Sequence, residues 1–230
     1  MQQALDICRE SGGKFDITVA PITSLWNFSS ESPVVPDKAA LAEAVTHVGY
    51  DKLEIDGDRV RLTDPAAGVD LGGVAKGYIA DRLREYLVSQ KVSGALIDLG
   101  GNVLAVGDKQ GEAFREGIRD PQDSAALAAT VAVRDRSVVT SGSYERGFTQ
   151  HGVYYHHILD PASGYPVNNG LAAVTILSEQ SVVGDMLSTT CFVLGEEEGL
   201  ALVERTDGVE ALFVRADGTQ VTSSGFATVA

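Results

Sequence analysis

Short apolar segments typical of β-strands follow one another through most of this 230-residue chain, with few helical segments between them. A regular alternation of strand and helix would predict a parallel sheet, whereas grouped strands predict an α+β fold. We therefore expect a single domain over residues 1–230, in which grouped mixed strands are flanked by helices. The expected strands include residues 95–99, 103–106, 116–119, 128–133, 137–141, 154–159 and 171–177. The first of these is short and apolar, so we expect it to be buried.

Helical periodicity is confined to a few stretches with recognisable ends. The expected helices cover residues 1–10, 37–48, 75–90, 182–193 and 196–205. Asp37 should cap the second helix, because a carboxylate at this position accepts hydrogen bonds from the first-turn N–H groups. Hairpins are predicted around Asp56-Gly57 and between residues 210–214 and 219–222.

The charge balance excludes some classes of partner. The chain has 18 basic and 32 acidic residues, and its formal net charge of −14 repels nucleic acid and anionic membranes. We therefore expect no nucleic-acid partner. Residues 1–6 lack the basic and apolar regions of a signal peptide. Cys8 and Cys191 are too few for a disulfide framework, so we expect buried thiols.

His157 stands at the end of an apolar run, directly before a turn rich in proline, serine and glycine at residues 161–166. A histidine at such a junction is held by the scaffold yet accessible to a ligand. Imidazole can take up and release a proton near neutral pH, so His157 is a candidate general base. The alternative is a hydrogen-bonded histidine that only ends a strand.

A glycine-rich segment, Asp70-Leu71-Gly72-Gly73-Val74-Ala75-Lys76-Gly77, lies where an extended segment meets a predicted helix. The N–H groups and dipole of a helix N-terminus attract phosphate, and Lys76 could add a full charge. The alternative is a tight packing turn. Its first four residues, Asp-Leu-Gly-Gly, recur at residues 98–101, so the chain can pass close to another group at both places.

Asp185 and Thr189 are four residues apart near the start of a predicted helix, so their side chains share one face. A carboxylate and a hydroxyl are hard oxygen ligands of the kind that Mg²⁺ prefers. The alternative is that Asp185 only complements the helix dipole while Thr189 bonds back to the chain. The polar turn at residues 140–146 follows a strand. Its hydroxyl groups could contact a nucleotide, and the alternative is a turn that only satisfies its own polar groups.

Together these motifs resemble the ApbE family of flavin transferases, which are FAD:protein FMN transferases. The similarity runs from about Gly13 to the C-terminus. The matching segments, in the family's order, are residues 15–21 with 25–26, 70–77, 98–101, 140–142 with 144–146, 157–167, and 185–189 with 194–195. The resemblance implies an ApbE-like, T-fold-like architecture.

The resemblance also implies roles for individual residues. Asp185 and Thr189 would hold Mg²⁺ together with the backbone carbonyl of Gly73, and Ser188 stands at a position that carries a metal ligand in some members. His157 would be the catalytic base that activates the acceptor hydroxyl. The implied FAD contacts are Lys14, Phe15, Asp16, Asp70, Lys76 and Leu159.

The implied reaction cleaves the pyrophosphate of FAD with Mg²⁺, transfers FMN to a threonine or serine hydroxyl and releases AMP. The implied partners are FAD and an acceptor flavoprotein with a Ser/Thr-containing flavinylation motif, such as a subunit of a membrane redox complex. Two other activities stay open: an FAD pyrophosphatase that gives FMN and AMP, and a non-catalytic FAD-binding protein.

The start of the chain differs from the family pattern. Members usually have some tens of residues before the first matching segment, whereas this chain opens inside a predicted helix. The resemblance therefore implies an N-terminally truncated domain. Members are usually exported and anchored to the periplasmic side of the inner membrane, and some are cytoplasmic. The sequence leaves the compartment of this chain open.

Overall fold

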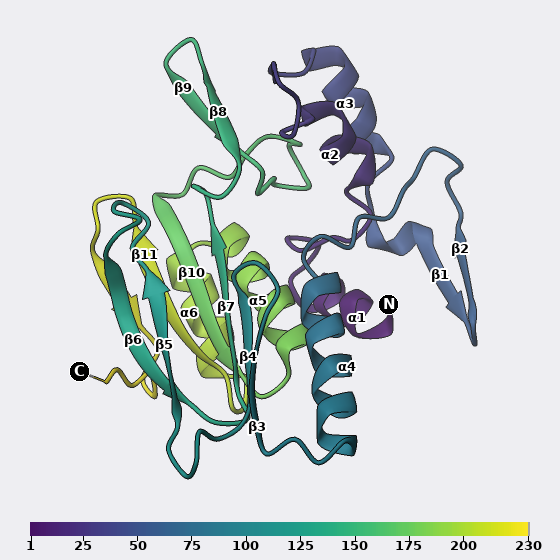
Figure 1. Cartoon of the computed structure of the whole chain (residues 1–230). Coiled ribbons are helices and arrows are strands. Elements are labelled where there is room, and N and C mark those ends of the chain that lie inside the picture. Colours follow the sequence, from purple (N-terminus) through teal and green to yellow (C-terminus); the bar gives the residue numbers. More distant parts are fainter. Residues whose placement is uncertain (230) are drawn as a thin grey trace. The chain divides into compact units, whose positions relative to one another are not determined.

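The computed structural model describes residues 1–229, which form two compact units, each built from two stretches of chain (Figure 1). The first unit comprises Met1–Leu71 and Ser143–Asn169. The second comprises Gly72–Gly142 and the chain from Gly170 onward. The expectation of a single functional domain over residues 1–230 stays a prediction.

A six-stranded antiparallel sheet forms the centre of the second unit, with strand order β12-β11-β10-β7-β4-β3. Its strands, in chain order, are β3 (Gly94–Asp98), β4 (Asn102–Gly107), β7 (Ser137–Gly142), β10 (Leu171–Ser178), β11 (Glu210–Arg215) and β12 (Gln220–Thr222). β10 lies inside the sheet and consists largely of β-branched and small apolar residues, as a strand covered on both faces should. A separate hairpin pairs β5 (Phe114–Arg119) with β6 (Leu127–Val133).

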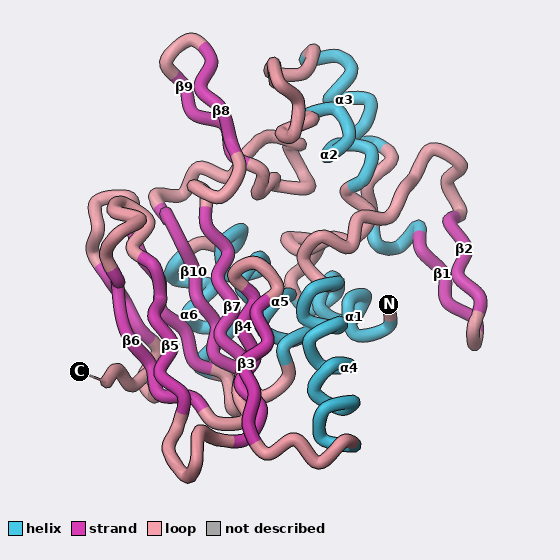
Figure 2. Tube along the Cα trace, viewed as in Figure 1, coloured by secondary structure: helices cyan, strands magenta, loops and turns pink. Residues whose placement is uncertain are grey.

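Three helices pack against this sheet: α4 (Ala75–Ser89), α5 (Ser181–Leu194) and α6 (Glu196–Glu204). α5 contacts β7 and β10 and lies beside both α4 and α6, while α4 contacts β4 and α6 contacts β11. Figure 2 shows the helices in cyan and the sheet in magenta. α5 is apolar around most of its circumference, which is typical of a helix buried between a sheet and other helices.

The N-termini of α4 and α5 are capped by each other's carboxylates. Asp81 of α4 accepts hydrogen bonds from the backbone N–H groups of Ser181 (2.9 Å) and Val182 (2.9 Å), which open α5. Asp185 of α5 accepts one from the N–H of Gly77 (2.8 Å), in the first turn of α4. Neither helix has a side-chain cap of its own, so each depends on the other for this role.

Gly77 makes this close approach possible. A Cβ atom at position 77 would lie 2.4 Å from the backbone oxygen of Ser181 and 2.6 Å from the Cα of Val182. Both contacts are with backbone, which cannot rotate away as a side chain can. The glycine therefore fixes the spacing of α4 and α5 and, with it, the position of Asp185.

The first unit combines helices with two hairpins and has its own apolar core. Its elements are α1 (Gln2–Glu10), α2 (Ala20–Trp26), α3 (Lys38–Thr46), the 3₁₀ turn η1 (Tyr50–Lys52), β1 (Leu53–Asp56), β2 (Arg59–Leu62), β8 (Gly147–Gln150) and β9 (Val153–His156). Trp26 is fully buried, stacks on Phe28 with ring centroids 5.5 Å apart, and donates from Nε1 to the carbonyl of Gly164 (2.7 Å). Phe148 and Tyr155 of the β8–β9 hairpin also contact its ring. The core thus anchors the segment that carries His157.

The predicted α+β class is confirmed, and all five predicted helices occur within two residues of their expected ends. Asp37 caps α3 by accepting from the N–H groups of Ala39 and Ala40. Both predicted hairpins are present. Cys8 and Cys191 are buried free thiols, as expected. No helix among residues 1–229 combines the length and hydropathy needed to cross a membrane.

Two local predictions are wrong, and one helix was not predicted. The strand at residues 95–99 is not buried, because β3 is the edge strand of its sheet and leaves Leu96 exposed. The strand expected at 154–159 ends at His156, because the chain then turns and Val167 pairs back onto Ile158. Helix α2 was not expected, because its seven residues include a proline and two β-branched residues.

Replacing Asp81 tests the reciprocal capping. Asp81→Ala leaves two buried N–H groups of α5 without their acceptor, so we expect the free energy of unfolding to fall by about 2 kcal/mol. Asp37→Ala, which removes the exposed cap of α3, is the control and should cost about 1 kcal/mol. Urea denaturation followed by circular dichroism measures both. A loss from Asp81→Ala no larger than that from Asp37→Ala would contradict a special role for the α4–α5 contact.

Candidate active site

Four side-chain oxygen groups gather in the second unit, where α5 packs on β7. Asp185, Ser188 and Thr189 occupy positions i, i+3 and i+4 of α5 and therefore lie along one face of the helix. Ser141 of β7 completes the group: its Oγ lies 2.8 Å from Ser188 Oγ and 3.2 Å from Thr189 Oγ1. Ser188 Oγ also donates to the carbonyl of Asp185 (3.0 Å). The four residues form what we call the oxygen cluster.

Asp185 is almost fully buried, with 4% of its surface exposed. Burial raises the pKa of its carboxyl group, because a carboxylate loses hydration when it leaves water. The Gly77 N–H and the charge of Lys76 oppose this effect and favour the ionised form. A buried carboxylate that is kept ionised in this way is suited to bind a cation, because the positive charge replaces the stabilisation that water would otherwise give.

The N-terminus of α4 provides the other groups expected at this place. Its first helical hydrogen bond runs from Tyr78 N to Val74 O (3.0 Å), so the carbonyl of Gly73 lies just outside the helical ladder. Lys76 Nζ donates to the carbonyl of Gly100 (3.3 Å) in the second glycine-rich turn. The Gly77 N–H, expected to contribute to a phosphate site, donates instead to Asp185.

The donor set fits Mg²⁺. This cation prefers oxygen ligands and keeps several waters, so it needs few carboxylates from the protein. Among residues 1–229, no group of three or more His, Cys, Asp and Glu side chains could hold a metal. A site for a transition metal would more often use the nitrogen of histidine or the sulfur of cysteine. The single carboxylate and three hydroxyl groups of the oxygen cluster are oxygen ligands of the kind that Mg²⁺ prefers.

In the first unit, His157 follows β9 and is oriented by Arg146, which precedes β8. The carbonyl of Arg146 accepts from the backbone N–H of His157 (3.1 Å) and lies 3.2 Å from its Nδ1. A carbonyl can only accept, so this contact requires a proton on Nδ1 and leaves the lone pair of the neutral ring on Nε2. His157 is partly exposed. The geometry is that of a base which takes a proton at Nε2.

The neighbouring His156 has a different environment. It is 7% exposed, its Nε2 donates to the carbonyl of Val167 (2.8 Å), and its Nδ1 accepts from the N–H of Ile158 (3.2 Å). Burial lowers the pKa of His156, although the bond to Val167 partly opposes this. Both ring nitrogens are bonded to backbone groups that follow position 157, at Ile158 and Val167, so His156 fixes the turn that presents His157.

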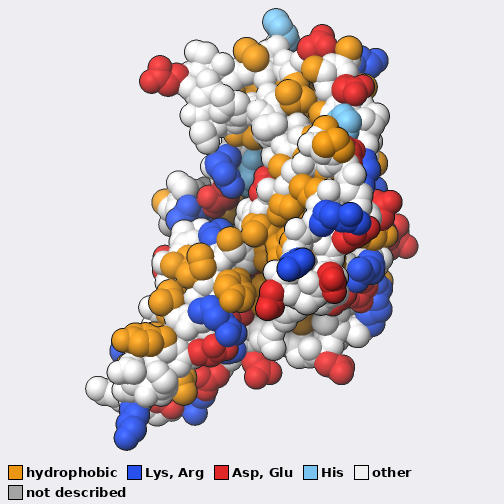
Figure 3. All heavy atoms as spheres, turned by 90° about the vertical axis from the view of Figure 1, so that its right-hand side faces the viewer, with side chains coloured by type: hydrophobic (Ala, Val, Ile, Leu, Met, Phe, Trp, Pro, Cys, Tyr) orange, Lys and Arg blue, Asp and Glu red, His pale blue; other side chains and the backbone are white. Residues whose placement is uncertain are grey.

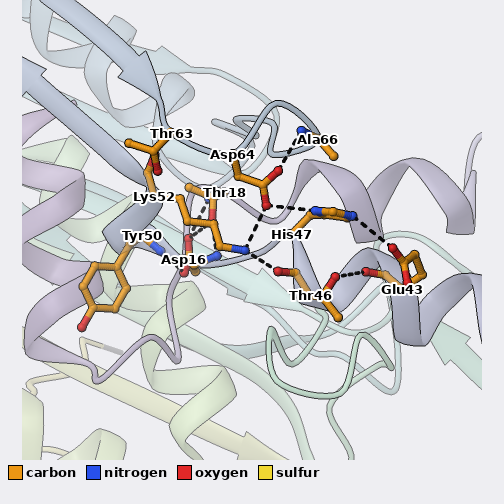
Figure 4. Close-up of polar contacts among 11 residues, drawn as sticks. Asp16, Thr18, Glu43, Thr46, His47, Tyr50, Lys52, Thr63, Asp64 and Ala66 are labelled. Carbon is orange, nitrogen blue, oxygen red and sulfur yellow. Dashed lines mark hydrogen bonds and ion pairs between the residues drawn. The ribbon is translucent and has the colours of Figure 1, made fainter.

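Lys14, Phe15 and Asp16 form the loop between α1 and α2. Phe15 is buried, and Lys14 Nζ lies 3.7 Å from a carboxylate oxygen of Asp160. Asp16 Oδ1 accepts from the N–H and the hydroxyl of Thr18 (both 2.7 Å), and its Oδ2 accepts from the N–H of Tyr50 (2.8 Å; Figure 4). The Asp16 carboxylate therefore orders the loop.

Asp70 and Leu159 have equally defined surroundings. The Asp70 N–H donates to the carbonyl of Ile17 (2.8 Å), and its Oδ2 accepts from the hydroxyl of Thr23 (2.8 Å). Leu159 is 7% exposed and belongs to the core around Trp26. The structure thus brings Asp70 beside the loop that contains Asp16, and it places Leu159 in the core that anchors the His157 turn.

A group of ionisable side chains at the C-terminal end of α3 supports the segment that leads to Asp70 (Figure 4). Asp64 Oδ2 lies 2.9 Å from His47 Nδ1 and 3.2 Å from Lys52 Nζ, and its Oδ1 accepts from the N–H of Ala66 (2.9 Å). The bond to His47 lowers the pKa of Asp64 well below its usual range and raises the pKa of His47. These contacts hold the segment before Gly68, which pairs with Val19.

The sequence did not reveal one member of the oxygen cluster, Ser141, or the backbone group that holds Asp185 in place. Ser141 belongs to the polar motif that was expected to contact a nucleotide, but its hydroxyl lies against Ser188 and Thr189. The Gly77 N–H reaches Asp185 across 108 positions of chain. Both residues lie in segments that match the family's motifs, but a motif match does not show which groups contact each other.

Comparisons with known proteins agree with the fold and the motifs. The model of the ApbE family matches residues 1–213. The FAD:protein FMN transferase of Treponema pallidum (strain Nichols) is 38% identical, and the match covers 98% of this chain and 67% of that protein. The FAD:protein FMN transferase of Klebsiella pneumoniae (strain 342) is 39% identical, and the match covers 96% of this chain and 69% of that protein.

A solved structure gives the same result. The crystal structure of the ApbE protein from Thermotoga maritima superposes with a TM-score of 0.89 at 34% sequence identity. The superposition covers 97% of this chain and 74% of that chain. The similarity therefore extends through both units of this chain.

The histidines give a test of the first unit. In an NMR titration, His47 should titrate above its ordinary pKa of 6.5 and His156 below it. His156 takes up protons more readily in the unfolded chain, so its contribution to stability should be lost as the pH falls below 6.5. His47 acts in the opposite sense: its contribution is present below 6.5 and lost as the pH rises through its folded pKa. The reverse order of titration would contradict the environments described above.

Proposed function

This chain belongs to the ApbE family, and from that membership we propose that it transfers FMN from FAD to a Ser or Thr hydroxyl of a target flavoprotein, with release of AMP. The relatives described above are FAD:protein FMN transferases by name. The observation in this chain that most supports the reaction is the oxygen cluster, held in place by the α4–α5 contact. Phosphoryl transfer depends mainly on positioning and charge neutralisation, which such a cluster can provide.

The oxygen cluster is the proposed magnesium site. Asp185 and Thr189 would bind the ion with the carbonyl of Gly73, and Ser188 would bind or orient it. When bound, Mg²⁺ neutralises charge that develops on the pyrophosphate oxygens. Lys76, whose ammonium group lies at the second glycine-rich turn, adds positive charge for the same phosphates.

The remaining proposed contacts are with FAD. Asp70 and the loop Lys14–Phe15–Asp16 would contact the flavin nucleotide, as would Leu159. Because the Asp16 carboxylate accepts three hydrogen bonds from its own unit, we propose that it acts by shaping the loop. Lys14 carries the exposed charge of that loop, beside Asp160.

His157 is the proposed general base. A threonine or serine hydroxyl is a weak nucleophile until its proton is removed. His157 Nε2 would take that proton as the hydroxyl oxygen bonds to the FMN phosphorus, while the bond from phosphorus to the AMP phosphate breaks. AMP leaves with the electrons of that bond. The carbonyl of Arg146 holds the ring in the tautomer that this step requires.

Removal of the imidazole tests this role. His157→Ala should reduce the transfer rate by about 100-fold or more, since general-base catalysis contributes roughly 10²–10⁴-fold. FAD binding should change little. The control is His151→Asn, which replaces an exposed histidine at the tip of the same hairpin with a residue that tolerates its positive φ of 51°. Normal transfer by His157→Ala would remove His157 from the mechanism.

Release of AMP distinguishes the alternatives. We expect AMP from FAD and Mg²⁺ only when an acceptor domain is present. AMP formed at the same rate without acceptor would identify a pyrophosphatase, in which water replaces the hydroxyl. FAD that binds but stays intact with every acceptor tested would indicate a binding protein.

The magnesium site has its own test. Asp185→Asn keeps an oxygen that can accept from the Gly77 N–H but removes the negative charge. The Mg²⁺ concentration for half-maximal activity should rise at least about tenfold, because loss of even an outer-shell partner has this effect. Asp37→Asn, at the exposed N-cap of α3 in the first unit, is the control and should leave the Mg²⁺ requirement unchanged. An unchanged requirement in Asp185→Asn would contradict the assignment.

A further inference from the structure

Asn102 stands out among the buried polar residues of the second unit. It begins β4, and its surface is completely buried. Its Nδ2 is the one buried side-chain nitrogen or oxygen atom among residues 1–229 that lacks a hydrogen-bond partner. A buried amide left in this way is destabilising, because it has given up its hydrogen bonds to water. Such a group requires an explanation in terms of what it faces.

The hydrogen bonds of the other amide atom fix the orientation of Asn102. Its Oδ1 accepts from the hydroxyl of Ser181 (2.7 Å), and Ser181 Oγ lies 2.9 Å from Ser137 Oγ. Neither hydroxyl is exposed to solvent. This arrangement directs the Nδ2 hydrogens of Asn102 away from Ser181.

The group on the other side is the carboxyl of Asp185. Ser181 and Asp185 are four residues apart on α5 and share one face of the helix, so Asn102, which is bonded to Ser181, lies against the face that carries Asp185. Asn102 also lowers the pKa of Asp185 against the effect of burial. Reversal of the amide would turn Oδ1 toward the carboxylate, and two acceptors would then face each other. The observed orientation therefore turns a donor, and not a second acceptor, toward Asp185.

The second Asp-Leu-Gly-Gly motif brings Asn102 to this place. Asp98 Oδ1 accepts from the N–H of Gly101 (3.1 Å), and the carbonyl of Asn102 accepts from the N–H of Leu99 (2.9 Å). Gly100 and Gly101 have φ values of 66° and 84°, which favour glycine. This turn directs the next residue, Asn102, into the sheet, just as the first motif leads into α4 and the Gly77 N–H.

We propose that Asn102 is a positioning residue for the metal site: when the ion is bound, its side-chain amide donates to the Asp185 carboxylate and fixes the orientation in which that carboxylate binds the ion. The inference rests on the magnesium site proposed above and adds a residue to its support. Asp185 Oδ2 already accepts from the Gly77 N–H. A second donor, from the other glycine-rich motif, would restrain the carboxylate from rotating.

The test measures metal binding without flavin or acceptor. Asn102→Leu keeps the size of the side chain and removes its donor. With Mn²⁺ as the probe and electron paramagnetic resonance as the readout, we expect binding to weaken by about tenfold or more. Thr175→Val is the matched control, because it removes a fully buried hydroxyl of β10 that bonds to Thr140 (2.8 Å). This control should bind Mn²⁺ like the unmodified chain.

Asp185→Asn in the same assay separates this inference from the proposed function. If Asp185→Asn binds Mn²⁺ weakly and Asn102→Leu binds it normally, the metal site stands and the role of Asn102 is overturned. If both variants bind normally, the metal site is overturned as well. Equal weakening in Thr175→Val would show a general effect of disturbing the sheet and would also overturn the specific role.

A measurement on the unmodified chain covers the case in which Asn102→Leu does not fold. The side-chain amide resonances of Asn102 should shift when Mg²⁺ is added, because the donor then faces a carboxylate that binds a cation. The side-chain resonances of Asn27, an exposed residue of the first unit, should stay in place. Asn102 resonances that do not move at saturating Mg²⁺ would overturn the proposal.

Discussion

The reciprocal capping of α4 and α5 by Asp185 and Asp81 is the constraint on which the candidate magnesium site depends. Each helix begins without a side-chain cap of its own, and each receives one from the other through Asp81 and Asp185. Gly77 allows the backbones to come close enough for this reciprocal capping. One carboxylate therefore stabilises a helix N-terminus and also supplies the only full negative charge of the oxygen cluster. Stability and chemistry are coupled at this residue.

The small number of charges in the cluster suits the substrate. The pyrophosphate of FAD is anionic, and the chain itself carries a formal net charge of −14. Additional carboxylates would bind Mg²⁺ more tightly but would repel the phosphates that the ion must also contact. Three hydroxyl groups supply oxygen atoms without that repulsion, and Lys76 supplies positive charge nearby. Figure 3 shows acidic and basic side chains interspersed with hydrophobic ones over one face of the molecule.

Local patterns in the sequence were sufficient for the helices and for the contents of each motif, but not for contacts between distant segments. Asp185 and Thr189 could be placed on one helix face because four residues make about one turn. Ser141 and the Gly77 N–H meet that face only through tertiary packing, and Asn102 reaches it through a turn that the sequence marked only as a repeated motif. The edge position of β3 could not be predicted either, since an apolar segment does not show how many neighbours its strand will have. Short α2, with its proline, lacked a clear periodicity.

The most direct test of the proposed activity is intact-mass spectrometry of a candidate acceptor domain after incubation with this chain, FAD and Mg²⁺. The account predicts the added mass of one FMN group on a single Ser or Thr, with AMP formed in equal amount. The adduct should be absent when Mg²⁺ is removed by a chelator. FMN and AMP in solution with an unmodified acceptor would contradict the transferase assignment, because water would then be the group that attacks the phosphorus.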